Sequence, residues 1–173
     1  MKLEAKITIV SIIITLIAII VTIIAINGDS PKKDIEENIA LANNLIIELR
    51  FNEQFLKDKI LTLNEIKDTE KYRIDKLETT ITYQAREKIN FGTPEIRIYL
   101  EAYLQKIKYI KESLESIKQN GGGIRQPELI NSLISSAEYL LFVEEESKPT
   151  LDMIINKISE YRDTEINKLE NLN

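Results

Sequence analysis

The side chains that could do chemistry in this chain are carboxylates, amines and hydroxyls, because the sequence contains no cysteine, histidine or tryptophan. Without a thiol or an imidazole there is no thiolate nucleophile, no Ser-His-Asp triad and no ordinary zinc site. The glycines at 121–123 are followed by Ile124 and Arg125, so they do not complete a phosphate-binding loop. Carboxylates on amphipathic helices are nearly always a solvated face. We therefore predict that the protein is not an enzyme and holds no metal ion or cofactor.

One carboxylate, Glu53, falls on a predicted core face. It is the only break in a seam whose members recur at alternating steps of four and three: Ile35, Ile39, Ala42, Ile46, Leu49, Glu53, Leu56, Ile60 and Leu63. A carboxylate on an apolar seam must be paired, neutralised or turned outward. Glu53 is therefore a candidate buried polar group or ligand site. The alternatives are local over- or under-winding that turns it to solvent, and a partner such as an arginine on a neighbouring helix.

A second set of side chains lies in the uncharged stretch 7–26. At about 1.5 Å per residue this stretch covers roughly 30 Å, the thickness of the hydrocarbon core of a bilayer. We predict a transmembrane signal anchor. A cleaved signal peptide is the alternative, but its apolar region is normally about 7 to 15 residues long and ends at an A-x-A-like site. Residues 25–27, Ala-Ile-Asn, match such a site poorly.

The smaller residues of the predicted anchor lie on one stripe, at alternating steps of three and four: Thr8, Ser11, Thr15, Ala18, Thr22 and Ala25. Small residues allow helix backbones to approach closely in lipid, and Ser and Thr can hydrogen-bond across the interface. The stripe predicts packing against a partner helix, which is either a second copy or another protein's helix. The alternative is that these residues only dilute an isoleucine-rich span.

The elements that position these side chains are all predicted to be helical. Residues 1–6 form a short N-terminal tail, 27–30 a linker, and 31–173 one bundle domain. Ser30-Pro31 is a strong helix start, since a capping residue precedes proline at the first helical position. A turn is expected near 64–70. The alternative is a single helix from about 31 to 91.

Later boundaries are clearer. Gly92 ends a helix, and Thr93-Pro94 starts the next. That next helix is predicted to end at Asn120 and the glycines that follow it. It carries an unbroken apolar seam: Ile96, Leu100, Tyr103, Ile107, Ile110, Leu114 and Ile117. Pro127 starts another helix, and the segment 144–149 ends or kinks it before a final helix. The predicted fold is all-α, with an N-terminal transmembrane helix followed by an elongated antiparallel bundle of four or five helices.

Charge restricts the partners. The 28 acidic and 23 basic residues are intermixed, and no basic stripe for nucleic acid is visible. Basic residues flank the anchor almost equally. A short charged N-terminus before an apolar stretch resembles a signal anchor, so we expect a single-pass membrane protein whose N-terminus is cytoplasmic and whose bundle is extracytoplasmic.

In the order of its elements the chain resembles the extracytoplasmic four-helix sensor modules of bacterial chemoreceptors and sensor kinases. Those receptors return through a second membrane helix, whereas this chain stops at Asn173, so a self-contained receptor is not expected. The leading hypothesis is a non-enzymatic, membrane-tethered interaction protein, an adapter or subunit of a membrane complex. The alternative is a ligand-sensing bundle that signals through a partner membrane protein.

Overall fold

The computed structural model describes residues 31–61, 77–119, 127–143 and 149–172. Within these ranges every regular element is a helix, which confirms the all-α class. The elements are a helix over residues 31–55 that continues as the π-helix η1 (Leu56–Ile60), α2 (Thr80–Glu87), α3 (Pro94–Gln119), α4 (Pro127–Phe142) and α5 (Leu151–Glu170).

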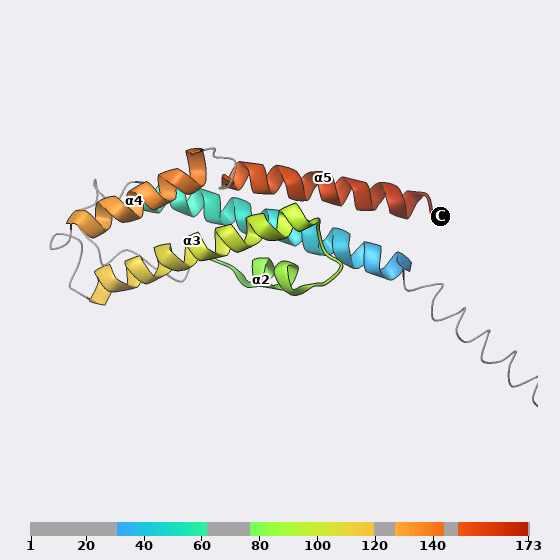
Figure 1. Cartoon of the computed structure of the whole chain (residues 1–173), viewed down its shortest axis with the longest axis horizontal. Coiled ribbons are helices and arrows are strands. Elements are labelled where there is room, and N and C mark those ends of the chain that lie inside the picture. The colour runs from blue at the N-terminus through green and yellow to red at the C-terminus, as the bar shows by residue number, and fades with distance from the viewer. Residues whose placement is uncertain (1–30, 62–76, 120–126, 144–148, 173) are drawn as a thin grey trace, which may run out of the picture.

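The helices pack side by side along one long axis (Figure 1). Helix 31–55 and α3 run in the same direction, while α4 and α5 follow one another in the opposite direction. The short α2 lies beside α3 and is antiparallel to it. Helix 31–55 is joined to α5 by hydrogen bonds between Asn38 and Glu165 and between Arg50 and Asp152. The predicted helical bundle is therefore confirmed. The C-terminal part of the chain, which runs opposite to α3, consists of two successive helices, α4 and α5.

The seam of α3 is confirmed in full. All seven predicted positions are at most 4% exposed: Ile96, Leu100, Tyr103, Ile107, Ile110, Leu114 and Ile117. The predicted start of this helix is also observed, because the Thr93 hydroxyl accepts a hydrogen bond from the Ile96 backbone N–H at 3.3 Å. Gly92 precedes it with a φ of 73°, the left-handed region that glycine adopts without a steric penalty. This turn redirects the chain from α2 into α3.

The single helix over residues 31–91 is wrong. The first helix and its π-turn give way to a turn at Leu61, and residues 77–79 are not helical before α2 begins. The predicted turn at 64–70 lies outside the described residues. The α2 helix ends at Glu87, earlier than the predicted boundary at Gly92. The first helix and α2 are therefore separate helices, on either side of residues 62–76.

The buried face of helix 31–55 differs from the predicted one at alternate positions. Both faces share Ala42, Leu49 and Leu56, which are fully buried. The predicted Ile39 and Ile46 are only half-buried. The residues that lie deepest in their place are Asn38, Leu45 and Asn52. The apolar pattern favoured isoleucine over asparagine, but the asparagines are buried because they bind groups of distant segments.

The segment after α4 ends the helix rather than only bending it. The α4 helix stops at Phe142, and α5 starts after Thr150, whose side chain accepts from the Met153 backbone N–H at 3.3 Å. The buried face of α4 includes Leu133, Ala137 and Leu140. Residues 144–148 lie outside the described residues. The break allows α4 and α5 to cover different parts of the same core.

Across the ranges that the structure describes, no helix is long and apolar enough to cross a membrane. The predicted anchor, residues 7–26 with its stripe of small residues, lies outside those ranges. The anchor therefore stays a prediction.

Candidate functional site

Glu53 is buried, with 7% of its surface exposed, and its carboxylate is paired within its own helix. Arg50 Nη1 donates to one carboxylate oxygen at 2.6 Å, and Lys57 Nζ donates to the other at 2.5 Å. These partners come from one turn before and one turn after, not from a neighbouring helix. Of the alternatives that the sequence left open for Glu53, the structure shows a buried and paired carboxylate, with a partner on each carboxylate oxygen.

The two cations beside Glu53 offset the effect of burial on its pKa. Burial raises the pKa of Glu53, but the hydrogen bonds and charges of Lys57 and Arg50 outweigh it and lower the pKa below its ordinary value. Arg50 also donates to Asp152 of α5 at 2.7 Å. Glu53 therefore holds Arg50 where it links the first helix to the start of α5.

A second buried carboxylate, Glu48, lies one turn earlier and binds the N-terminus of α2. Its two oxygens accept from the backbone N–H groups of Ile81 at 2.8 Å and Thr82 at 2.9 Å. It also accepts from the Thr82 hydroxyl at 2.5 Å. The local cap residue, Thr79, makes no side-chain cap bond. Glu48 therefore caps α2 from another helix. The first N–H groups of a helix have no acceptor within that helix, so they favour a negative charge at this end.

Asn52 extends this contact by one turn. Its side-chain oxygen accepts from the Glu78 backbone N–H at 2.9 Å, and its amide nitrogen donates to the Glu78 carbonyl. The same nitrogen donates to the Tyr103 hydroxyl at 2.7 Å. Asn52 therefore satisfies the backbone of the extended segment before α2 and joins it to α3. Glu48, Asn52 and Tyr103 together form what we call the α2 clamp.

Burial and nearby charges shift the pKa values of Tyr103, a member of the α2 clamp, and of the neighbouring Lys111. Burial raises the pKa of Tyr103, the hydrogen bond from Asn52 lowers it, and the Glu48 charge raises it again, with a large net rise. Burial lowers the pKa of Lys111, against the opposing charges of Glu78 and Glu48. Lys111 Nζ donates to the Thr79 hydroxyl at 3.1 Å, which explains why that hydroxyl does not cap α2. All these groups bind other parts of the protein, so the clamp is a structural device.

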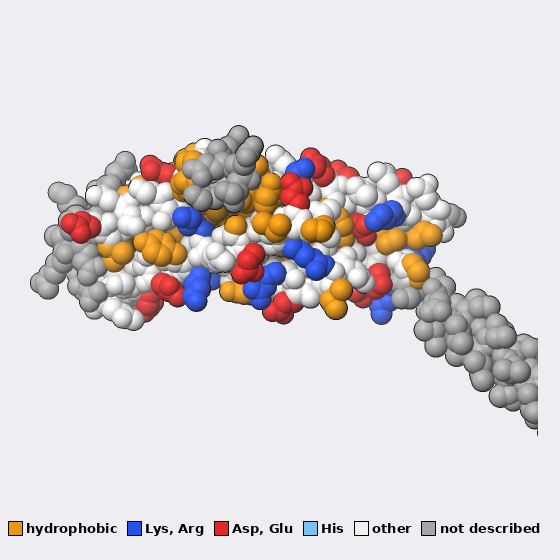
Figure 2. All heavy atoms as spheres, viewed as in Figure 1, with side chains coloured by type: hydrophobic (Ala, Val, Ile, Leu, Met, Phe, Trp, Pro, Cys, Tyr) orange, Lys and Arg blue, Asp and Glu red, His pale blue; other side chains and the backbone are white. Residues whose placement is uncertain are grey.

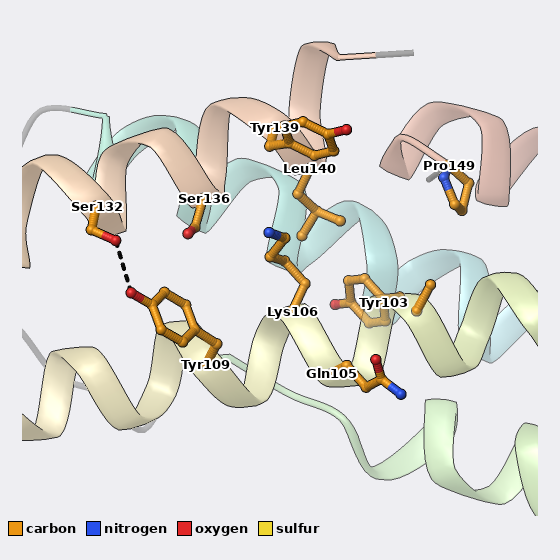
Figure 3. A pocket seen from close by; sticks show the side chains of 10 residues that line it. Tyr103, Gln105, Lys106, Tyr109, Ser132, Ser136, Tyr139, Leu140 and Pro149 are labelled. Carbon is orange, nitrogen blue, oxygen red and sulfur yellow. Dashed lines mark hydrogen bonds between the residues drawn. The ribbon is translucent and has the colours of Figure 1, made fainter. Parts of the chain in front are cut away.

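An open cavity lies beside the α2 clamp, between α3 and α4 (Figure 3). Its volume is about 590 Å³, within the range of roughly 300 to 1,000 Å³ that small-molecule sites occupy. Its walls carry Tyr103, Lys106 and Tyr109 from α3 and Ser132, Ser136 and Tyr139 from α4. Lys106 Nζ lies 5.2 Å from the centre of the Tyr139 ring, and the Tyr109 hydroxyl is 2.8 Å from Ser132 Oγ. The cavity thus combines aromatic faces, hydroxyls and one cation.

An apolar groove lies between helix 31–55 and α2, and Glu48 of the α2 clamp lines it. Its volume is about 460 Å³ and its wall includes Ile47, Phe51 and Ile81, with Glu78 at the edge. Ile47 is 67% exposed and Phe51 is 48% exposed, one turn apart on the same helix face. Large apolar side chains are seldom left this exposed in such a pair without a role in binding. On the face shown in Figure 2, Lys/Arg and Asp/Glu side chains are intermixed.

The sequence indicated only part of these features. It identified Tyr103 as a core residue and Glu53 as a buried carboxylate, but it did not single out Glu48, Asn52 or Lys106. One signal was present for Asn52: it lies seven residues from Leu45, which in turn lies seven from Asn38, so the three follow one heptad position. Glu48 and Lys106 carry no such signal, since their roles depend on α2 and α4.

No protein-family model, curated protein sequence or solved structure matches this chain. The assignment of function therefore rests on the geometry of the clamp, the groove and the cavity.

Proposed function

We propose that this chain is a non-enzymatic, membrane-tethered helical bundle that binds another membrane protein. The observation that carries the proposal is the apolar groove on helix 31–55, the helix that follows the predicted anchor. Ile47 and Phe51 present a pair of apolar side chains at helical spacing beside Ile81. Such a surface accepts one apolar face of an amphipathic helix.

The groove indicates the chemistry of its occupant. At about 1.5 Å per residue, Phe51 lies roughly 30 Å along the helix from Pro31, which supports an occupant outside the bilayer for a helix that leads away from the predicted anchor. The edge of the groove carries the exposed Glu78. We therefore propose that the occupant is an extramembrane helix of a second membrane protein, with an apolar face flanked by lysine or arginine.

The test is photo-crosslinking of the full chain in native membranes, with a benzophenone amino acid at position 51 or, as a control, at Ile98. Ile98 is 65% exposed on α3, away from the groove. The proposal expects one discrete adduct with another membrane protein from position 51, none from position 98, and loss of the adduct in the Ile47→Asp variant. Equal labelling from both positions, or an adduct of two copies of this chain, would contradict it.

A ligand-sensing bundle is the second candidate, and the cavity between α3 and α4 favours it. Tyr103 lines this cavity and also accepts the hydrogen bond from Asn52 that helps to hold α2. A ligand in the cavity would therefore touch Tyr103 of the α2 clamp, while Glu48 of the same clamp lines the apolar groove. A melting temperature of the full chain that rises when a small molecule is added, together with altered crosslinking at position 51, would favour this candidate.

A further inference from the structure

The described residues that line the cavity between α3 and α4 include one charged side chain, that of Lys106. Lys106 is the cation of its wall, and no aspartate or glutamate is among the described residues that line it. Among those residues Lys106 forms no ion pair, and its ammonium group faces the Tyr139 ring instead. By contrast, Lys157 of α5 lies near both Glu95 and Glu160. Lys106 thus offers an ammonium group to an anion entering the cavity.

The other lining groups define the rest of a ligand. Hydroxyls of Tyr109 and Ser132 already contact each other at 2.8 Å, and either can donate to an acceptor placed beside them. Ser136, only 9% exposed, brings another hydroxyl to the same side (Figure 3). The tyrosine rings and Leu140 supply flat and apolar surface. One cation matches one negative charge, which favours a carboxylate over a phosphate dianion.

We propose that this cavity binds a small organic monocarboxylate with a flat, apolar or aromatic body. The carboxylate lies against Lys106 Nζ and accepts one hydrogen bond from the Tyr109–Ser132 pair, donated by whichever hydroxyl does not donate to the other, while the body packs against the side chains of Tyr139 and Leu140. A charge-assisted hydrogen bond of this kind is stronger than a neutral one. The inference goes beyond the protein-binding proposal and does not depend on the apolar groove.

The experiment is isothermal titration calorimetry on the full chain in mild detergent, with benzoate as the probe. Three further probes separate the contributions: benzamide has the same shape without the charge, cyclohexanecarboxylate has the charge without the aromatic ring, and inorganic phosphate has charge without an apolar body. Saturable benzoate binding is expected. Benzamide and phosphate should bind at least about tenfold more weakly, and cyclohexanecarboxylate should bind within about tenfold of benzoate.

Variants place the site. Lys106→Met, which keeps the length of the side chain, should weaken benzoate binding by about tenfold or more, and Lys106→Arg should retain most of it. Lys108→Met is the matched control, because Lys108 is 71% exposed on the same helix and pairs with Glu112; it should leave benzoate affinity unchanged. Circular dichroism checks that each variant folds.

Four results would overturn the inference. They are an absence of saturable benzoate binding up to about 10 mM, equal binding of benzoate and benzamide, tighter binding of phosphate than of benzoate, and an unaltered benzoate affinity in a folded Lys106→Met variant. Since the probe comparison uses the native chain, it holds even if a variant fails to fold. Crosslinking at Phe51 is measured separately, so failure of the carboxylate site is distinguishable from failure of the protein-binding proposal.

Discussion

At the scale of single residues, the buried carboxylates of the first helix have different tasks. Glu48 binds the backbone of another helix, whereas Glu53 pairs with cations of its own helix. The backbone N–H groups replace water as hydrogen-bond donors to the Glu48 carboxylate. The two residues therefore differ in what their removal exposes.

Replacing Glu48 by Gln should lower the free energy of unfolding by about 1 to 3 kcal/mol, because an amide offers one acceptor oxygen where the carboxylate offers two. The N-terminus of α2 then keeps an unsatisfied N–H group. Urea unfolding of a chain that begins at Ser30 measures this. Glu87→Gln is the control, since Glu87 is 71% exposed on α2, and it should change stability by no more than about 0.5 kcal/mol. Equal effects of the two substitutions would contradict the capping role.

Replacing Glu53 by Gln should destabilise the bundle at pH 7 by roughly 0.5 to 1.5 kcal/mol, a small effect because Arg50 and Lys57 are themselves 49% and 41% exposed. The pKa of Glu53 is lowered in the folded protein, so its contribution is fully present above the unfolded value, about 4.3, and is lost as the pH falls through the folded pKa.

The difference between Glu53→Gln and the native chain should therefore shrink as the pH falls below about 4. Urea midpoints measured at intervals from pH 7 to the acid limit of folding follow it. Glu112→Gln removes a more exposed pair with Lys108, and should leave the pH profile unaltered. A Glu53→Gln difference that is constant with pH would mean that the ion pairs add nothing.

At the scale of the elements, α3 is the helix that the other described elements share. It contacts α2, α4 and α5, and Ile107 lies in the middle of its seam with 1% exposure. Replacing Ile107 by Ala should lower the free energy of unfolding by about 2 to 5 kcal/mol, since it leaves a cavity in a packed core.

The matched control is Ile98→Ala on the same helix. Ile98 is 65% exposed, so its truncation should change stability by no more than about 0.5 kcal/mol. Thermal melting of the two variants beside the native chain makes the comparison. A loss below about 1 kcal/mol for Ile107→Ala would show that the middle of the α3 seam is loosely packed.

At the scale of the whole molecule, the proposed function needs the bundle to be held near its partner. Replacing Thr15 and Ala18 of the predicted anchor by Leu should leave membrane insertion intact and weaken association, because larger side chains obstruct close approach of two helices. A membrane two-hybrid assay reports association, and carbonate extraction reports insertion.

The control for the anchor is the pair Ile13→Leu and Ile20→Leu, which lies off the stripe. These substitutions should leave association unchanged. If the stripe variant also associates normally, the small residues only dilute an apolar span, and the apolar groove alone would supply the contact with a partner.

The sequence by itself determined the helical class, the seam of α3 and most helix boundaries. These follow from local rules: apolar residues at steps of three and four form one helix face, and Thr93 and Pro127 mark the starts of α3 and α4, whereas α2 ends at Glu87, before the predicted boundary at Gly92. It also marked Glu53 as a carboxylate on the apolar seam, because a single break in such a seam is visible without knowing the neighbours; whether it was buried or turned to solvent stayed open.

Only the tertiary structure decided the face of helix 31–55 that lies deepest, the shortness of α2 and the places where polar groups converge. Asn52 and Glu48 are buried because the backbone of residues 78–82 needs hydrogen-bond partners, and no local pattern reveals that need. Lys106 faces Tyr139 because α3 and α4 pack together. Polar burial depends on partners distant in sequence, whereas apolar burial depends on periodicity, and this difference separates what the chain reveals from what its fold adds.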